Sequence, residues 1–407
     1  MSLSLRAPRR GRGRRSLQTS GERRSPAGMA GFLVGAAAMF AAMYSTQAIL
    51  PELSRAFDVS ASRAGLTISV AVVALAAGAW AWGPLSDRIG RKRSLVLASA
   101  LLVVPTIGAG LAPTFDVLLA FRALQGLCMP GLLAVGLPYV TEAFAPRTGG
   151  RAMGYYVAAL IAGALTGRIG VALVTAAVGW RFGIGGLAVL PLGAALLMRR
   201  SLVDLPLPQR TAGRVRGVAR QLLNRALLRA AATGSTFFFV FVGTFSYVTY
   251  RLERPPFEFG TAAIGLVFLL WPLGAVTPLV GRVADRLGWQ RVALAALGVA
   301  AAGIALTVPA ILPTLFGGLA LVAIGNFAGV TAAQLGVADA TTIDRGAASA
   351  IYFSIYYATG AFGAYLPGLA WQAWAWPGVA VLELAVIATA ALVLLSSRDT
   401  ASARRRA

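Results

Sequence analysis

Residues 83–93 read Gly83-Pro-Leu-Ser-Asp87-Arg88-Ile-Gly90-Arg91-Lys92-Arg93 and lie directly between two long apolar segments. A short polar turn with this much charge, between helices long enough to cross a bilayer, belongs at a membrane face. Gly83 allows close contact between helices, Gly90 allows a tight turn, and the cations indicate the cytoplasmic side. An ordinary arginine-rich cytoplasmic loop is the alternative. We call residues 83–93 the first loop.

A weaker copy of this loop, which we call the second loop, occurs at residues 281–291. Asp285, Arg286 and Gly288 repeat Asp87, Arg88 and Gly90 at an offset of 198 positions, about half of the chain. A repeat of this size, with the same loop after a hydrophobic helix, predicts two homologous six-helix halves side by side in the membrane. Chance similarity between two short loops is the alternative.

The composition of the chain is that of a polytopic membrane protein. Its 407 residues are 57% hydrophobic and only 13% charged, with 47 glycines, which is too apolar for a soluble protein of this length. There is no histidine and a single cysteine, Cys128, for which we expect a small buried side chain. No histidine triad, metal cluster or disulfide framework is available, so we expect neither an enzyme nor a cofactor. The net charge of +23 is concentrated between and beyond apolar segments, which argues against a nucleic-acid partner.

Twelve apolar windows of about twenty residues predict an all-α membrane protein with twelve transmembrane helices. We expect a disordered basic tail over 1–28, a six-helix half over 29–198, a cytoplasmic linker over 199–227, a second half over 228–396 and a basic tail over 397–407; Met29 is an alternative start. The windows lie near 29–50, 62–83, 94–112, 117–140, 151–172, 180–198, 228–250, 260–281, 291–310, 313–335, 347–369 and 377–396.

The distribution of cations predicts the orientation. With both termini in the cytoplasm, the tails, the two loops and the arginine-rich linker lie on the cytoplasmic side. The other side then holds only Arg55, Arg63, Arg181, Arg251 and Arg254. We therefore expect a multi-pass protein of the bacterial plasma membrane, in contact with lipid. The sequence does not determine the oligomeric state, and a monomer is compatible with it.

The first loop resembles the loop between helices 2 and 3 of the major facilitator superfamily, at Asp87, Arg88, Gly90, Arg91 and Lys92. Further matches to its drug–proton-antiporter and arabinose-efflux-permease-like branch lie at 44–51, at Gly163 with Gly167 and Arg168, and at 345–357. The resemblance covers most of residues 29–396. It implies the fold and a transport activity, but not the substrate.

The resemblance also implies roles for charged residues at the first loop. Asp87 would lie against the start of helix 11, near residues 347–349, where the helix dipole favours a negative charge. Arg91 would pair with Glu142 at the end of helix 4. Such contacts would hold the halves together when the protein opens outward. Static anchoring of the loop is the alternative.

Three ionisable side chains lie deep within the spans, where a charge is costly unless it faces protein, a partner or water. Arg122 lies in Leu119-Ala-Phe-Arg122-Ala-Leu-Gln125-Gly126, which resembles the helix 4 motif whose arginine faces the central cavity and is implicated in proton coupling. Arg168 is a functional candidate or a structural donor. Glu383, on helix 12, is a further candidate, with a carboxyl kept neutral by an apolar site as the alternative.

A less specific signal comes from aromatic and amide side chains at positions that could line a cavity. Packing or interfacial anchoring is the alternative for each of them. They are Tyr44, Gln47, Gln125, Tyr247, Trp271, Asn326, Tyr352 and Tyr356.

We therefore expect a transporter that moves a small solute by alternating access, exporting a drug-like compound, sugar or metabolite in exchange for protons. Asp87 is the preferred proton-carrying acid, with Glu383 second. A proton-independent or uptake carrier is the first alternative. A membrane sensor built on a transporter fold is the second, but no segment outside the spans is apolar enough for a folded sensor domain.

Overall fold

The computed structural model describes residues 26–144, 150–205, 219–341, 343 and 345–406. All regular secondary structure in these ranges is helical. Residues 1–25 of the basic tail expected over 1–28, and the linker arginines Arg210, Arg214 and Arg216, lie outside the described residues. Residues 26–28, which were expected in that tail, instead form the start of the first helix.

The first half of the chain forms a bundle of helices. Its elements are α1 (Pro26–Tyr44), η1 (Gln47–Ile49), α2 (Leu50–Phe57), α3 (Ala61–Ile89), α4 (Arg91–Gly110), α5 (Phe115–Cys128), α6 (Pro130–Tyr139), η2 (Val140–Phe144), α8 (Gly150–Leu165), η3 (Thr166–Gly170), α9 (Val171–Val178), α10 (Trp180–Gly186) and α11 (Val189–Ser201).

The second half repeats this bundle. Its elements are α13 (Arg225–Glu253), α14 (Thr261–Leu266), η4 (Val267–Val276), α15 (Thr277–Leu287), α16 (Trp289–Leu306), α17 (Leu312–Asp339) and α18 (Arg345–Arg406). α18 contains a non-helical break at Trp374 and Ala375. We call residues 345–373 its first segment and residues 376–406 its second segment.

The helices of the structure correspond to the twelve membrane crossings expected from the sequence. Within the described ranges, ten stretches are long and apolar enough to span a bilayer. One of them, residues 346–396, covers both segments of α18 and so supplies two crossings. The remaining crossing, over residues 261–287, is divided among α14, η4 and α15. The all-α fold expected from the sequence is therefore confirmed, except that α18 continues to Arg406 instead of ending near residue 396.

Capping side chains set several helix starts. Ser60 Oγ accepts from the Arg63 N–H at the start of α3, and Thr114 Oγ accepts from the Val117 N–H at the start of α5. Inside the bundle, small residues allow close packing: a Cβ on Gly163 of α8 would come within 2.1 Å of the Ala37 carbonyl oxygen on α1. Such contacts are typical of helices that associate in lipid, where dispersion must replace the hydrophobic effect.

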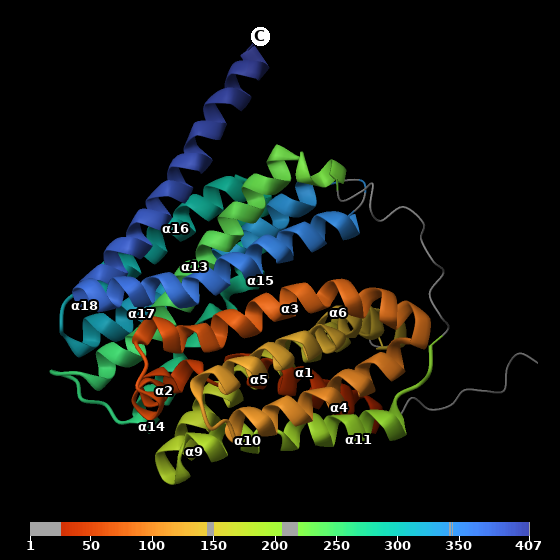
Figure 1. The fold of residues 1–407 in the computed structure, drawn as a ribbon. Helices are drawn as coiled ribbons and strands as arrows, with labels where there is room; N and C mark the ends of the chain where they lie inside the picture. Colours follow the sequence, from red (N-terminus) through yellow and green to blue (C-terminus); the bar gives the residue numbers. More distant parts are fainter. Residues whose placement is uncertain (1–25, 145–149, 206–218, 342, 344, 407) are drawn as a thin grey trace, which may run out of the picture.

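The two halves lie one against the other, with α3 of the first half beside α18 of the second (Figure 1). α2 and α14 lie at one end of the molecule, and the last turn of α11 lies at the other (Figure 1). We call the end that carries the first and second loops the loop face. The end that carries α2 and α14 is the opposite face.

Candidate functional site

The first loop forms a tight turn between α3 and α4. Gly90 has φ 90° and ψ 155°, and its N–H donates to the Ser86 carbonyl (3.0 Å). Gly288 in the second loop has φ 82° and ψ 145°, so the two turns share one backbone conformation, which side-chain-bearing residues rarely adopt. Asp285 and Arg286 beside it are exposed. Gly83 lies half-buried within α3, and its expected role in helix packing stays a prediction.

The expected ion pair between Arg91 and Glu142 is present. Arg91 Nη2 lies 2.6 Å from Glu142 Oε1, and only 12% of the Arg91 side chain is exposed. Glu142 lies on η2, at the loop-face end of the helix 4 crossing. Asp87 is half-buried near the end of α3, and its expected place near residues 347–349 stays a prediction.

Arg122 on α5 is fully buried and joins three helices. Its Nε donates to the Thr67 carbonyl on α3 (2.8 Å). Nη1 and Nη2 donate to the Ala42 and Met43 carbonyls on α1, each at 2.6 Å. Because α1 ends at Tyr44, the guanidinium lies at the negative end of that helix dipole and adds a charged donor to the last carbonyls of the helix.

Side chains complete the network around Arg122. Nη1 also donates to Ser45 Oγ (3.2 Å) and to Gln125 Oε1 (2.7 Å), while Gln125 Nε2 donates to Thr106 Oγ1 (3.0 Å). All three guanidinium nitrogens are therefore engaged within the first half. The proposed role of Arg122 in proton coupling stays a prediction.

Arg168 lies on η3, where α8 gives way to a π-helical turn, and is also fully buried. Its guanidinium carbon lies 3.9 Å from the centre of the Tyr44 ring and 3.6 Å from that of Trp271. Tyr44 belongs to the first half and Trp271 to the second, so the cation is held between aromatic faces of both halves. Nε donates to Gln47 Oε1 (2.7 Å), whereas Nη2 has no hydrogen-bond partner within the described chain.

Direct contacts between the halves gather toward the opposite face. Gln47 Nε2 donates to Ser246 Oγ (3.0 Å), Ser54 Oγ and Tyr250 Oη lie 2.7 Å apart, and Arg55 pairs with Glu253. Ser69 Oγ donates to the Ala361 carbonyl (2.6 Å), and Gln372 Nε2 donates to Ser62 Oγ (3.1 Å). We call these five pairs the seam. The seam closes the opposite face, where η1, α2 and α3 meet α13 and the first segment of α18.

Glu383 lies on the second segment of α18. Val381 and Leu392 of this segment are exposed, but Glu383 points inward and is fully buried. Thr244 Oγ1 on α13 donates to Glu383 Oε2 (2.7 Å). The structure thus places Glu383 at the contact between α13 and α18 inside the second half. The hydrogen bonds and ring contacts of Arg168 involve other residues.

The remaining aromatic candidates pack on one another. Tyr356 stacks on Phe238 of α13, with ring centres 4.1 Å apart, and on Tyr352 at 5.6 Å. Tyr247 is buried and donates to the Ala364 carbonyl (2.6 Å). Asn326 on α17 is buried, and its Oδ1 has no hydrogen-bond partner within the part of the chain described. Tyr352 and Tyr356 therefore form a stack with Phe238 at the contact between α13 and the first segment of α18.

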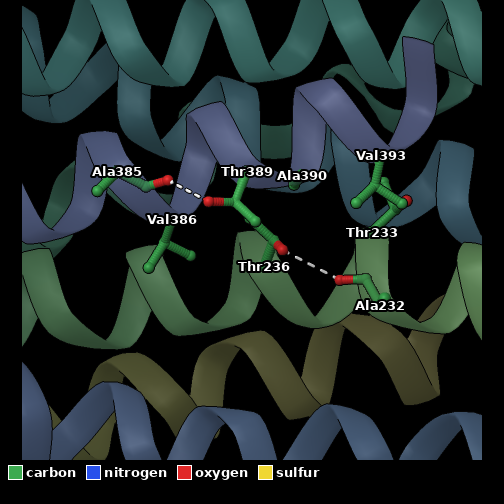
Figure 2. A pocket seen from close by; sticks show the side chains of 8 residues that line it. All are labelled: Ala232, Thr233, Thr236, Ala385, Val386, Thr389, Ala390 and Val393. Carbon is green, nitrogen blue, oxygen red and sulfur yellow. Dashed lines mark hydrogen bonds between the residues drawn. The ribbon is translucent and has the colours of Figure 1, made fainter. Parts of the chain in front are cut away.

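A groove of about 310 Å³ runs between α13 and the second segment of α18 (Figure 2). Its walls are mostly apolar, and two of its hydroxyls donate to their own helices: Thr236 to the Ala232 carbonyl and Thr389 to the Ala385 carbonyl (Figure 2). Thr233 likewise donates to its own helix, to the Arg229 carbonyl. The groove therefore offers no free hydrogen-bond donor and contains none of the candidate site residues.

The family model of the Major Facilitator Superfamily matches residues 32–275, more than half of the chain. The chain belongs to this superfamily. It is therefore a multi-pass membrane transporter, as the resemblance of the first loop predicted, and not an enzyme.

Relatives and solved structures agree with this family. The "Inner membrane transport protein YnfM" of Escherichia coli K12 is 30% identical over 361 residues, 88% of this chain and 87% of the relative. The "Uncharacterized MFS-type transporter YybF" of Bacillus subtilis is 27% identical over 348 residues, 84% and 85% of the two chains. A bacterial homolog of the human lysosomal transporter Spinster, in an inward-facing and occupied conformation, superposes with a TM-score of 0.75 at 16% identity, over 91% of this chain and 96% of that one. This last likeness shows the fold alone.

The residues of the second half that form the seam were not among the residues predicted from the sequence. Ser246, Tyr250 and Glu253 follow one another at helical spacing on α13 and face η1 and α2. A signal was present, because Arg55 and Glu253 have opposite charges and lie 198 positions apart, the offset of the two loops. Phe268, whose ring centre lies 5.2 Å from the Arg168 guanidinium carbon, gave no such signal.

Proposed function

We propose that this transporter exports a small solute by alternating access, in exchange for protons. The proposal rests on the seam, a set of contacts between the halves that lies toward the opposite face. Contacts of this kind hold one access route shut, and rocking of the halves would break them as the other route closes. The central solute site would then lie on the inner side of the seam, next to Arg168.

The proposed orientation places the loop face on the cytoplasmic side of a bacterial plasma membrane, with both chain termini in the cytoplasm. The cations of the first loop support it, as does the chemistry of the opposite face. There, Arg55 pairs with Glu52 and Glu253, and Arg63 lies 3.5 Å from Asp116. The loop face nevertheless carries more lysine and arginine side chains than the opposite face, and this bias is the one that orients membrane proteins. The printed name of YnfM, an inner membrane transport protein, is in line with this location.

The geometry around Arg168 favours a solute with an acidic or hydrogen-bond-accepting group. A buried guanidinium nitrogen without a partner is costly, and an acceptor on the solute would remove that cost. Tyr44 and Trp271 on either side of the cation would contact the apolar part of such a solute. An organic acid with a flat apolar group fits both features, among drug-like compounds and metabolites alike.

Counterflow and proton-flux assays in proteoliposomes test the proposal. A panel of labelled organic acids, their neutral amides and sugars is offered with and without a pH gradient. We expect accumulation of one or more acids that depends on the gradient, together with opposite proton movement. Uptake that is indifferent to the gradient would favour the proton-independent carrier, and failure to move any solute of the panel would favour a sensor.

The same assay tests the proposed gating role of Asp87. Asp87→Asn is expected to slow exchange several-fold while the protein stays folded, because the charge biases one state of a two-state element. Asp285→Asn, in the loop that lacks the cations following Gly90, is the matched control and is expected to do less. Equal and severe losses in both variants would contradict the role assigned to Asp87.

A further inference from the structure

The carboxyl of Glu383 is only half satisfied by the protein. Oε2 accepts from Thr244, but Oε1 has no hydrogen-bond partner, and no basic side chain pairs with Glu383 in the described ranges. It is also the one acidic side chain among the buried residues of those ranges. An ionised carboxyl in this setting would leave a buried charge without compensation. A proton on Oε1 would remove the charge and supply a donor.

An acceptor for that proton lies close by. Pro367 has no N–H, so the Gly363 carbonyl lacks the helical donor that position 367 would supply. Gly243 of α13 locates both oxygens: a Cβ built on it would lie 2.5 Å from Glu383 Oε1 and 3.3 Å from the Gly363 oxygen. Both oxygens therefore border the space that a side chain at Gly243 would fill, and the Gly363 carbonyl is buried there.

We propose that Glu383 is a proton-binding site, whose Oε1–H group donates to the Gly363 carbonyl when the seam is closed. Loss of the proton to water leaves two acceptor oxygens facing each other, which repel and weaken the bend at Pro367. This inference rests on the proposed proton exchange and deepens it, because it assigns the proton to Glu383 and not to Asp87.

The same turn of α18 connects Glu383 to the seam. On its other side, the Ala361 carbonyl accepts from Ser69 of α3, and the Ala364 carbonyl accepts from Tyr247. The first segment of α18 therefore lies between the seam and Glu383, with its proline-weakened turn at the contact. In the proposal, this turn has a straighter and a more bent state. The proton on Glu383 and the closed seam would each favour one of the two.

The other titratable groups near this level of the packed elements do not contact the Glu383 carboxyl. On α13, Tyr247 donates to Ala364, and Arg251 donates to the Val308 and Pro309 carbonyls (2.8 and 3.0 Å). On the first segment of α18, Tyr365 is the titratable side chain near this level. None of the three forms a hydrogen bond or an ion pair with Glu383, so the proton has one carboxyl to occupy.

Infrared difference spectroscopy of the full-length protein in nanodiscs tests the site without any solute. We expect a carbonyl stretching band of a protonated carboxylic acid that disappears as pH rises. The band should be lost in Glu383→Gln and kept in Glu258→Gln, which makes the same chemical change at an exposed residue. Gly243→Ala should shift the band, because the added methyl group would displace Oε1. An unchanged band in Glu383→Gln would overturn the assignment.

Accessibility of the seam tests the connection to α18. Ser62→Cys, in a Cys128→Ser background, carries a single thiol at a seam position. Each alkylation rate with a membrane-impermeant maleimide is divided by the rate of a small free thiol at the same pH, which corrects for thiol ionisation. We expect this corrected rate to rise with pH more when Glu383 is present than in the Glu383→Gln protein. Equal pH dependence in both would overturn the connection, even if the infrared band behaves as expected.

These results separate this inference from the proposed function. If solute-driven proton flux is absent from the unmodified protein but the infrared band is lost in Glu383→Gln, proton exchange fails and the site stands. If proton flux is present and survives in Glu383→Gln, the site fails and proton exchange stands. Loss of that flux in Glu383→Gln, with solute counterflow retained, is the outcome we expect.

Discussion

Arg55 on α2 forms an ion pair with Glu253 at the end of α13, across the boundary between the halves. The two residues are 198 positions apart, which is also the separation of Asp87 and Asp285 in the two loops. They therefore hold equivalent positions in the repeat. Equivalent residues can touch only where the two-fold relation brings the halves together, so this pair marks the pseudo-symmetry axis at the opposite face.

Reversal of this pair tests the assignment. Arg55→Glu alone should place like charges together and open the seam, whereas Arg55→Glu with Glu253→Arg should restore it. Because 54% of the Arg55 side chain is exposed, the effect on the free energy of unfolding should be at most about 1 kcal/mol. Maleimide labelling of Ser62→Cys measures seam opening, and failure of the double variant to slow labelling would contradict the pairing.

The two loop glycines provide a prediction about stability. Gly90→Ala and Gly288→Ala force a side chain into a backbone region that suits glycine, which should cost about 1–3 kcal/mol each. Gly154→Ala is the control, because Gly154 lies within helix α8 and a Cβ there meets nothing within 4 Å. Thermal unfolding in detergent measures the three variants. Equal stability of all three would show that the turns tolerate side chains.

The turns could be predicted from the sequence because a loop between two spans is a local structure. The glycine, the flanking charges and the lengths of the apolar segments all lie within a few residues of one another. The pairing of Arg91 with Glu142 was also expected, but only through the family resemblance. The seam could not be predicted in the same way, because its partners come together only when the halves dock.

The two buried arginines show a second limit of sequence reasoning. Arg122 and Arg168 both lie deep in apolar spans, and only the resemblance of residues 119–126 to a family motif sets Arg122 apart in the sequence. The two arginines differ in the groups that surround them in the fold. Arg122 donates to the last carbonyls of α1, whereas Arg168 lies between aromatic rings from both halves. The end of α1 at Tyr44 places those carbonyls at a helix terminus, and no proline or glycine at residues 44–47 predicts that end from the sequence.

Replacement of each buried arginine by methionine should separate structure from function. Arg122→Met removes the hydrogen bonds by which the guanidinium joins α5 to α1 and α3, and bonds from a charged donor contribute about 1.5–3 kcal/mol each, so we expect loss of folded protein. Arg168→Met removes a cation whose Nη2 is unsatisfied, so the folded yield should be largely retained while solute exchange is lost. Size-exclusion profiles and counterflow measure the two outcomes. A stable, inactive Arg122→Met would contradict the structural role.

The side chains around Arg168 yield a finer prediction for the solute. Arg168→Lys keeps the charge but loses the planar contact with Tyr44 and Trp271. We expect the KM for an acidic solute to rise about tenfold, with less change in the maximal rate, because uniform binding is weakened. Arg63→Lys, at an exposed position, is the control. A change in the maximal rate alone would move Arg168 from solute binding to gating.

The central claim is that the seam opens and closes during each transport cycle. Arg55→Cys with Glu253→Cys, in a Cys128→Ser background, places two accessible thiols across it for a bifunctional thiol reagent with a cleavable spacer. Counterflow of the solute found with the panel is then measured before cross-linking, after it and after cleavage. We predict that cross-linking stops exchange, that cleavage restores it, and that either single-cysteine protein is unaffected; undiminished exchange by fully cross-linked protein would contradict the claim.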